Sequence, residues 1–304
     1  MSSGSKTAAS VWHEGELQVQ ERAGVRREAE FLSGMYKSEV PGAMAAFLSQ
    51  QQFAVLSTRD GDGGAWASLV AGSPGMIQVT APDSIALIAA DIQTELPLSH
   101  ITADPKVGLI AIDFSRRIRV RVNGEARNLP EGNVQVKIAQ LYGNCSQYIQ
   151  KRCVDGTAPV TAPQLTAGGQ LSEAQQDFIR RADTFFLASR HPELGADASH
   201  RGGKPGFVTA SATRISFPDY PGNNMFNTLG NITVNPAVGL LFVDFESGRT
   251  LQVSGRATVD WDRERASHLD LAQRIVDVDV EAVRDTEHAT GLHYRFIGYS
   301  PTLG

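Results

Sequence analysis

The chain has 304 residues, of which 41% are hydrophobic and 20% are charged, a composition typical of soluble globular proteins. The net charge of -5 and the pI near 5.8 argue against nucleic-acid binding, which favours basic surfaces. No apolar run approaches the roughly 18 residues that a membrane-spanning helix requires, and the N-terminus is too polar for a secretory signal. We therefore expect a cytoplasmic protein without a membrane or nucleic-acid partner.

The two cysteines, Cys145 and Cys153, are too few for a disulfide framework or a four-thiolate metal site, and no metal site is expected. Cys145 lies in the sequence near Tyr142, Tyr148 and Lys151, and a thiol there becomes reactive if its pKa is depressed. Most lone cysteines are buried packing residues, which is the alternative. The sequence leaves the role of both thiols open.

The first half begins with a polar segment, residues 1–12, which we expect to be disordered, and then favours helix from about residue 24 to 52 because apolar residues recur there at helical spacing. A glycine-rich turn, DGDGG, between two apolar runs predicts a hairpin. A short helix is expected near residues 96–104, and we interpret residues 134–152 as a helix. The expected strands lie at residues 53–59, 65–72, 76–82, 84–91, 107–114 and 117–122.

Arginines occupy alternate positions of the strand expected at residues 117–122, so that Arg117, Arg119 and Arg121 share one face. Three arginines in such a row could form an anion-binding wall. More often, a row of charges on a strand faces solvent or forms salt bridges.

The second half follows a similar plan. A helix with a capping box at Ser172 and Gln175 precedes a strand, and a long loop is expected over residues 191–206. The tail from Asp262 reads as a charged helical segment. The expected strands of this half lie at residues 184–190, 207–212, 214–218, 238–245 and 250–262.

The two halves match when the chain is aligned with itself at a shift of 131 residues. Between positions 101 and 126, 11 of 26 residues are identical to their counterparts at 232–257, where composition alone would give roughly two. Two copies at this long period indicate tandem duplication of one β-rich unit and not a solenoid. We place the boundaries at residues 1–45 (N-terminal tail and helices), 46–155 (first copy), 156–170 (linker) and 171–304 (second copy).

The stretch FPDYPGNNMFNTLGNI, residues 217–232, is the strongest candidate for a binding site. A helix beginning near Asn223 would place Asn227, Thr228 and Asn231 on one face, and a helix N-terminus after a Pro-Gly turn favours anions. The alternative is an Asn-rich capped loop. At the three matching positions the first copy has Leu96, Pro97 and His100. We therefore expect the first copy to be structural and the second to carry the site.

The order of strands, a Pro-Gly-Asn turn, a short helix, NPxVGLLFVDF and a strand ending in VxGRA resembles the pyridoxamine 5′-phosphate oxidase-related flavin-binding split barrels. Residues 219–232, 199–208 and 142–152 carry a closer similarity to a tandem-duplicated branch, in which similar domains also occur fused to a ferredoxin-reductase-like module. The resemblance covers residues 12–301, and we expect no reductase module in this chain.

The resemblance implies a mainly β fold of two tandem antiparallel split barrels with flanking helices. It implies FMN at the interface between barrels, formed either by a homodimer or by the two barrels of one chain acting as a pseudo-dimer. The implied activity is that of an FMN-dependent oxidoreductase acting on a small-molecule substrate or on oxygen, with no catalytic residue assigned. The residues expected to hold the cofactor are His200, Arg201, Lys204, Arg214, Asp219, Tyr220, Asn223, Asn224, Asn227, Thr228 and Asn231.

The sequence departs from the family pattern at the phosphate site, because Met225 and Gly230 stand where related proteins often have arginine. We expect Arg201, Lys204 and Arg214 to supply the missing charge, since a phosphate dianion favours charge-assisted contacts. The rest of the site would come from residues 200–204 or from the facing barrel.

Two other functions stay open. One is a haem-binding split barrel, with an iron ligand chosen from several histidines. The other is a non-catalytic binding module, since a fold does not fix a function. The candidate haem ligands are His200, His268, His288 and His293.

Overall fold

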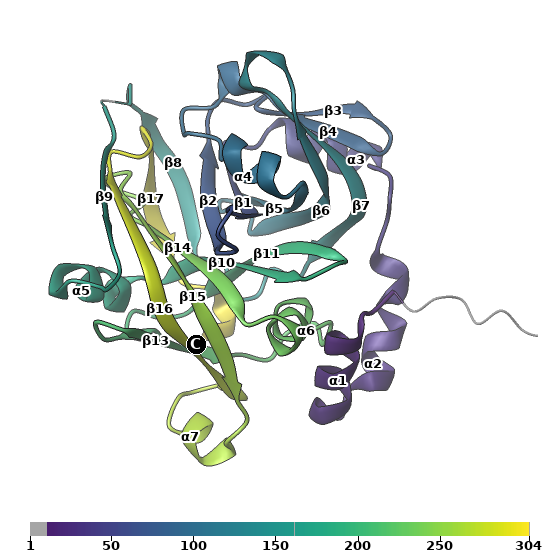
Figure 1. Ribbon diagram of the computed structural model, residues 1–304, viewed down its shortest axis with the longest axis vertical. Coiled ribbons are helices and arrows are strands. Elements are labelled where there is room, and N and C mark those ends of the chain that lie inside the picture. Colours follow the sequence, from purple (N-terminus) through teal and green to yellow (C-terminus); the bar gives the residue numbers. More distant parts are fainter. Residues whose placement is uncertain (1–10, 161, 304) are drawn as a thin grey trace, which may run out of the picture.

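The computed structural model describes residues 11–160 and 162–303, so residues 1–10 of the segment expected to be disordered lie outside the described range. Two antiparallel sheets, each curled into a split barrel, make up most of the fold (Figure 1). The first sheet has the strand order β2-β1-β5-β6-β7-β4-β3. Its strands are β1 (Phe53–Arg59), β2 (Ala65–Ala71), β3 (Ile77–Ala81), β4 (Ser84–Leu87), β5 (Lys106–Asp113), β6 (Ile118–Asn128) and β7 (Val134–Asn144).

The second sheet repeats this order as β11-β10-β14-β15-β16-β13-β12, and β9 joins it along β16. A separate two-stranded ribbon pairs β8 with β17. The remaining strands are β8 (Lys151–Thr157), β9 (Gln164–Gly168), β10 (Thr184–His191), β11 (Gly195–Gly202), β12 (Thr209–Ala210), β13 (Arg214–Asp219), β14 (Ala237–Val243), β15 (Thr250–Asp260), β16 (Arg274–Glu287) and β17 (Leu292–Gly298). The α-helices are α1 (Glu14–Ala23), α2 (Arg26–Phe31), α3 (Gly42–Ser49), α4 (Leu98–Ala103), α5 (Glu173–Arg181), α6 (Asn227–Val234) and α7 (Arg263–Ser267).

The duplication is visible in the register of the strands. Leu56 of β1 lies opposite Leu109 of β5, and Leu187 of β10 lies opposite Leu240 of β14, so both partners are shifted by 131 residues. A β-bulge interrupts β6 after Asn123, and another interrupts β15 at the matching place. The chain is therefore two tandem antiparallel split barrels, as the sequence predicted.

Each barrel has its own apolar core, and a third core joins them. Leu56 packs inside the first barrel and Leu187 inside the second, whereas Phe53, Phe186 and other side chains from the opposite faces of the same strands form a shared core. Because β1 and β10 are covered on both faces, their sequences read as almost continuous apolar runs.

Glycines let the two barrels approach each other backbone to backbone. A Cβ atom on Gly108 of β5 would lie 2.7 Å from the Cα of Asp197 in β11. The counterpart Gly239 of β14 would meet the Cα of Trp66 in β2 at the same distance of 2.7 Å. The barrels are thus related by an approximate twofold arrangement within one chain.

The predicted helix at residues 134–152 is wrong, since this segment forms β7 and the start of β8. Val134, Val136 and Ile138 are buried at alternate positions, which is the period of a strand, but the intervening polar residues favoured a helical interpretation. The helical tail is also wrong beyond α7, because β16 and β17 follow it.

Three further segments differ from the expectations. The long loop expected at residues 191–206 contains β11, and the stretch expected as a linker contains β9, which pairs with β16. Trp12, expected to be disordered, is 3% exposed and packs with Tyr142 and Met225. No helix within the described ranges is long and apolar enough to cross a membrane.

Candidate functional site

A pocket of about 110 Å³ lies where the two barrels meet. The first barrel contributes Arg119 and Arg121 from β6, together with Asn144, Cys145, Gln147 and Tyr148 at and after the end of β7. The second barrel contributes His200 and Arg201 from β11, together with residues 218–224 and 226–229, which run from the end of β13 to the first turn of α6. The pocket is therefore shared between the copies, whereas the sequence comparison placed the site in the second copy alone.

The guanidinium group of Arg119 has no carboxylate partner within the described part of the chain. Its Nη1 atom lies 2.9 Å from Nδ1 of His200, and its Nε is buried without a hydrogen-bond partner. Burial lowers the pKa of Arg119 to about 9, so the group stays positively charged at neutral pH. An uncompensated charge in a pocket is a favourable position for an anion.

His200 is 4% exposed and lies among these arginines. Burial, and then the charges of Arg119 and its neighbours, lowers the pKa of His200 well below its ordinary value, so the imidazole is neutral. Because Arg119 donates to Nδ1, the proton of the neutral ring lies on Nε2, which is buried without a partner in the described residues. His200 thus offers one free N–H donor.

The second arginine of β6, Arg121, is neutralised by a neighbouring carboxylate. Its Nη1 donates to both oxygens of Asp197 at 3.1 and 3.0 Å. The hydroxyl of Tyr142 donates to the same carboxylate at 3.1 Å. These contacts fix Arg121 in place and leave its Nε without a partner among the described residues.

On the opposite wall, one carboxylate holds two arginines. Asp219 Oδ1 accepts from Arg201 Nη1 at 2.9 Å, and Asp219 Oδ2 accepts from Arg274 Nε at 3.0 Å. Three of the four arginines of this region therefore pair with two aspartates, Arg121 with Asp197 and both Arg201 and Arg274 with Asp219, while Arg119 pairs with neither. The four arginines thus exceed the two aspartates by two positive charges.

The turn that leads into α6 has a strained backbone. Asn224 and Phe226 have φ angles of 60° and 61°, in the left-handed region that a bulky side chain such as phenylalanine disfavours. The side chain of Asn223 supports the turn by accepting a hydrogen bond from the Met225 N–H at 3.2 Å. Such strain persists where the surrounding structure imposes it, and it often accompanies binding sites.

The polar face of α6 is used mainly to hold the N-terminal helix. Asn227 donates to Glu16 Oε1 at 2.6 Å, and the Oδ1 of Asn231 lies 3.1 Å from His13 Nε2. Thr228 donates to Ser199 at 3.1 Å. Figure 1 shows α1 lying beside α6. The asparagine cluster thus has partners within the protein, and no pattern in the sequence predicted them.

Burial raises the pKa of Glu16 to about 7, although the backbone N–H of His13 and the amide of Asn227 donate to its carboxylate. The side chain is 5% exposed on the helix that covers the pocket wall. With a pKa of about 7, this carboxyl changes charge near neutral pH.

The structure brings eight of the eleven predicted cofactor residues to the pocket and leaves three outside it. Lys204 is exposed, Arg214 is exposed and paired with Asp279, and Asn231 is buried between Ser189 and His13, the N-cap of α1. The eight lining residues are His200, Arg201, Asp219, Tyr220, Asn223, Asn224, Asn227 and Thr228.

Residues of the first copy complete the pocket and were absent from the predicted set. The alternation along β6 placed Arg119 and Arg121 on one face, which was a usable signal. Arg117 of the same row instead donates to the carbonyls of Ile149 and Tyr299, both at 2.9 Å. The other first-copy residues of the pocket are Asn144, Cys145, Gln147 and Tyr148.

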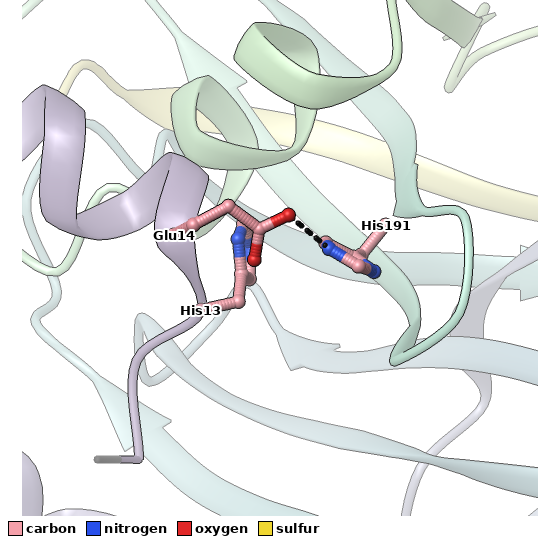
Figure 2. Close-up of side chains that lie close together, drawn as sticks. All are labelled: His13, Glu14 and His191. Atoms are coloured by element: carbon pink, nitrogen blue, oxygen red, sulfur yellow. Dashed lines mark hydrogen bonds and ion pairs between the residues drawn. The ribbon is translucent and has the colours of Figure 1, made fainter.

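A separate cluster of His13, Glu14 and His191 fastens α1 to the end of β10 (Figure 2). His191 Nδ1 accepts from the backbone N–H groups of Glu193 and Leu194 at 3.0 Å, so its Nε2 carries the proton that is donated to Glu14 at 2.9 Å. The Nδ1 of His13 likewise accepts from a backbone N–H, that of Gly15. A metal-bound histidine normally donates from its second nitrogen, so this arrangement suits a structural latch and not a metal.

Comparison with known proteins identified one family. The family model described as pyridoxamine 5′-phosphate oxidase matches residues 40–161 and again residues 171–292. No curated protein matches the chain.

Several solved structures resemble single portions of the chain. A putative pyridoxamine 5′-phosphate oxidase from Lactobacillus delbrueckii is 18% identical with a TM-score of 0.32, and the match covers 38% of this chain and 93% of that one. HupZ from Group A Streptococcus is 12% identical with a TM-score of 0.31, and the match covers 43% of this chain and 98% of HupZ. An FAD-binding protein from Mesorhizobium loti is 13% identical with a TM-score of 0.30, and the match covers 41% of this chain and 99% of that protein. At these values the similarities carry no functional argument.

Proposed function

The chain belongs to the pyridoxamine 5′-phosphate oxidase family, and on this premise we propose that the pocket between its barrels binds FMN through the flavin's phosphate group. In this proposal the two barrels of one chain do what two subunits do in a dimer. The shared core around Phe53 and Phe186 supports that part of it.

The observation that carries the proposal is the unneutralised charge of Arg119. A phosphate monoester carries a charge of about −1.5 to −2 at neutral pH, which matches the two positive charges by which the four arginines exceed the two aspartates. Free donors point to the same chemistry, since His200 Nε2 and the Nε atoms of Arg119 and Arg201 are buried without partners in the described residues. The residues present therefore fit a phosphate group.

The size of the pocket limits how FMN would be held. A volume of about 110 Å³ accommodates a phosphate group but is well below the roughly 300 Å³ at which pockets enclose larger ligands. The flavin rings would therefore lie in the open part of the pocket. The half-buried rings of Tyr148 and Tyr220, with centroids 5.1 Å apart, offer aromatic surface there.

When bound, the flavin would supply the redox chemistry of an oxidoreductase acting on a small molecule or on oxygen. The protein's own part is binding and orientation. Arg119 and Arg201 would hold the anion, His200 would donate one hydrogen bond, and Asp197 and Asp219 would fix the guanidinium groups around it. No residue of the pocket is assigned a proton-transfer role.

Titration of the purified protein with FMN and with riboflavin tests the proposal. Because riboflavin lacks the phosphate, we expect it to bind at least about tenfold more weakly than FMN. Arg119→Gln should lower the affinity for FMN by about tenfold or more and leave that for riboflavin unchanged. Arg116→Gln, at an exposed arginine outside the pocket, is the matched control. Equal affinities for FMN and riboflavin, or no binding of either, would contradict the proposal.

No observation favours the haem alternative. Of the four candidate histidines only His200 lines the pocket, and its Nδ1 faces the positive charge of Arg119. The absorbance spectrum after reconstitution separates flavin, haem and a binding module that holds neither.

A further inference from the structure

A second cavity, of about 750 Å³, also lies between the two barrels, where β15 of the second barrel meets β2 of the first. It is bordered by the segment leading into α4, by β2, and by β15 and β16. Its volume lies within the range of about 300–1,000 Å³ that is usual for small-molecule sites. The proposed flavin site leaves this cavity unexplained.

The strand register shows that this cavity is the internal counterpart of the phosphate pocket. Thr250 lies opposite Val243 in the second barrel as Arg119 lies opposite Ile112 in the first, and both members of the pair are shifted by 131 residues. By the same register Gln252 replaces Arg121, and Leu69 replaces His200. The groups proposed to hold a phosphate are therefore uncharged here.

The second cavity contains one arginine, Arg284, at a position that has no arginine in the phosphate pocket. Arg284 lies beside Gln252 on the neighbouring strand, where the first copy has Tyr142 beside Arg121. The guanidinium carbon of Arg284 lies 3.9 Å from the ring centroid of Trp66, and no salt bridge to Arg284 occurs within residues 11–160 and 162–303. Stacking orients the guanidinium without neutralising it.

The stack itself is held in place. The indole Nε1 of Trp66 donates to Asp60 Oδ2 at 2.6 Å, which fixes the ring beneath Arg284. The adjacent His100 is buried, and its Nδ1 lies 2.9 Å from Thr58 Oγ1. Burial, and then the charge of Arg284, lowers the pKa of His100, so this ring adds no second positive charge at neutral pH.

The other walls are apolar or neutral. Ile92, Leu96 and Leu98 line the segment before and at the start of α4, and Thr250 offers a hydroxyl on the opposite side. The only carboxylate among the lining residues, that of Glu95, belongs to an exposed residue. A single fixed guanidinium among apolar and uncharged polar walls matches one carboxylate on a largely apolar body, because arginine and carboxylate form paired hydrogen bonds.

We propose that this cavity is a second ligand site, distinct from the phosphate pocket, that binds an apolar monocarboxylate through Arg284. A phosphorylated flavin is excluded from the same role, since the positions of Arg119 and Arg121 are taken by Thr250 and Gln252. One chain would then hold two unlike ligands at its two internal junctions.

Calorimetric titration with 1-naphthoate and its neutral analogue 1-naphthalenemethanol tests this site in the full-length protein. We expect naphthoate to bind at least about tenfold more tightly than the alcohol. Arg284→Gln should reduce naphthoate affinity about tenfold or more and leave FMN affinity unchanged, and Arg284→Lys should give an intermediate value. Arg119→Gln should leave naphthoate affinity unchanged, and saturation with FMN should not displace naphthoate.

Several results would overturn the second site. Equal binding of the acid and the alcohol to the natural protein would do so without any variant, and so would a failure of naphthoate to bind. Loss of naphthoate binding in Arg119→Gln, or competition with FMN, would place the acid in the phosphate pocket. Because the two ligands are titrated separately, a failure of FMN to bind leaves this test intact.

Discussion

A single buried carboxyl, that of Glu16, links the N-terminal helix to the pocket wall. Its pKa in the folded protein, raised by burial to about 7, exceeds the ordinary value of 4.5 that applies to the unfolded chain. Between pH 4.5 and about 7, the carboxyl of Glu16 is therefore protonated in the folded protein and ionised in the unfolded chain. This contribution to stability is complete below pH 4.5 and is lost as the pH rises through about 7.

We expect Glu16→Gln to remove this pH dependence, because an amide stays neutral while keeping the shape of the side chain. Relative to the natural protein, the variant should gain up to about 3 kcal/mol in free energy of unfolding between pH 4.5 and pH 8, at 1.36 kcal/mol per pKa unit. Urea unfolding at several pH values measures the difference. The exposed Glu21 of the same helix, changed to Gln, should keep the natural slope between pH 5 and 8. Parallel pH profiles for Glu16→Gln and the natural protein would contradict this account.

Asp219 holds the guanidinium groups of two arginines, and we expect the protein's stability to depend on it. Asp219→Asn would leave the buried guanidinium groups of Arg201 and Arg274 without their carboxylate, and we expect a loss of about 3 kcal/mol in the free energy of unfolding. Asp279→Asn, which breaks the exposed pair with Arg214, should cost less than about 1 kcal/mol. Denaturant unfolding compares the two. Equal losses would show that the buried aspartate is not required to hold the arginines.

At the scale of elements, the contact between α1 and α6 depends on two small residues. A Cβ atom on Gly15 would lie 2.2 Å from the carbonyl oxygen of Gly230, so the helices touch through their backbones. The contact also leaves no room for a side chain at position 230, because a Cβ atom on Gly230 would lie 2.6 Å from the backbone nitrogen of Glu16. The N-terminal helix occupies the space that a longer side chain would need.

Gly15→Ala is expected to destabilise the protein by about 1–3 kcal/mol by forcing α1 away from α6. The sign of this change in the free energy of unfolding is informative, because alanine in a helix otherwise stabilises by about 1 kcal/mol relative to glycine. Gly34→Ala, where a Cβ would meet no atom within 4 Å, is the control. Urea unfolding together with limited proteolysis near Gly24 would report undocking of α1. A stabilised Gly15→Ala variant would show that the helices are not in contact.

The sequence predicted those elements whose residues repeat with one clear period. The apolar runs of β1, β5, β10 and β14 were found because both of their faces are buried. It failed for β7 and β16, where Lys, Gln, Asp and Glu alternate with apolar residues on the open face and favour a helical or charged reading. Local propensity cannot decide such segments, since pairing with distant strands does.

The pocket was half predictable for a related reason. Second-copy residues such as Asn227 and Thr228 lie in one continuous stretch of the chain. The comparison of the two copies singled out this stretch, because the first copy lacks its polar residues. Arg119 reaches the same pocket only because β6 of one barrel packs near β11 of the other, and its partner His200 is 81 residues away. That proximity follows from how two folded barrels meet, which no local pattern encodes.

At the scale of the whole molecule, the core between the barrels should make them unfold together. Phe53 contacts Phe114, Phe186 and Phe245, which belong to both halves of the chain. We expect Phe53→Ala to lower the free energy of unfolding by about 3–5 kcal/mol while keeping a single transition. Phe31, which is 88% exposed, changed to Ala should shift stability by less than about 0.5 kcal/mol. Calorimetry that resolves two separate transitions in the natural protein would contradict this coupling.

The joining of both barrels in one polypeptide also changes what mutation can do. In a homodimer, every substitution appears twice, so both symmetry-related sites must change together. Here Arg119 and Thr250 occupy equivalent places yet are encoded separately. Each junction can therefore gain or lose a ligand without altering the other. Fusion of the two copies thus frees one site to diversify while its twin stays under its original selection.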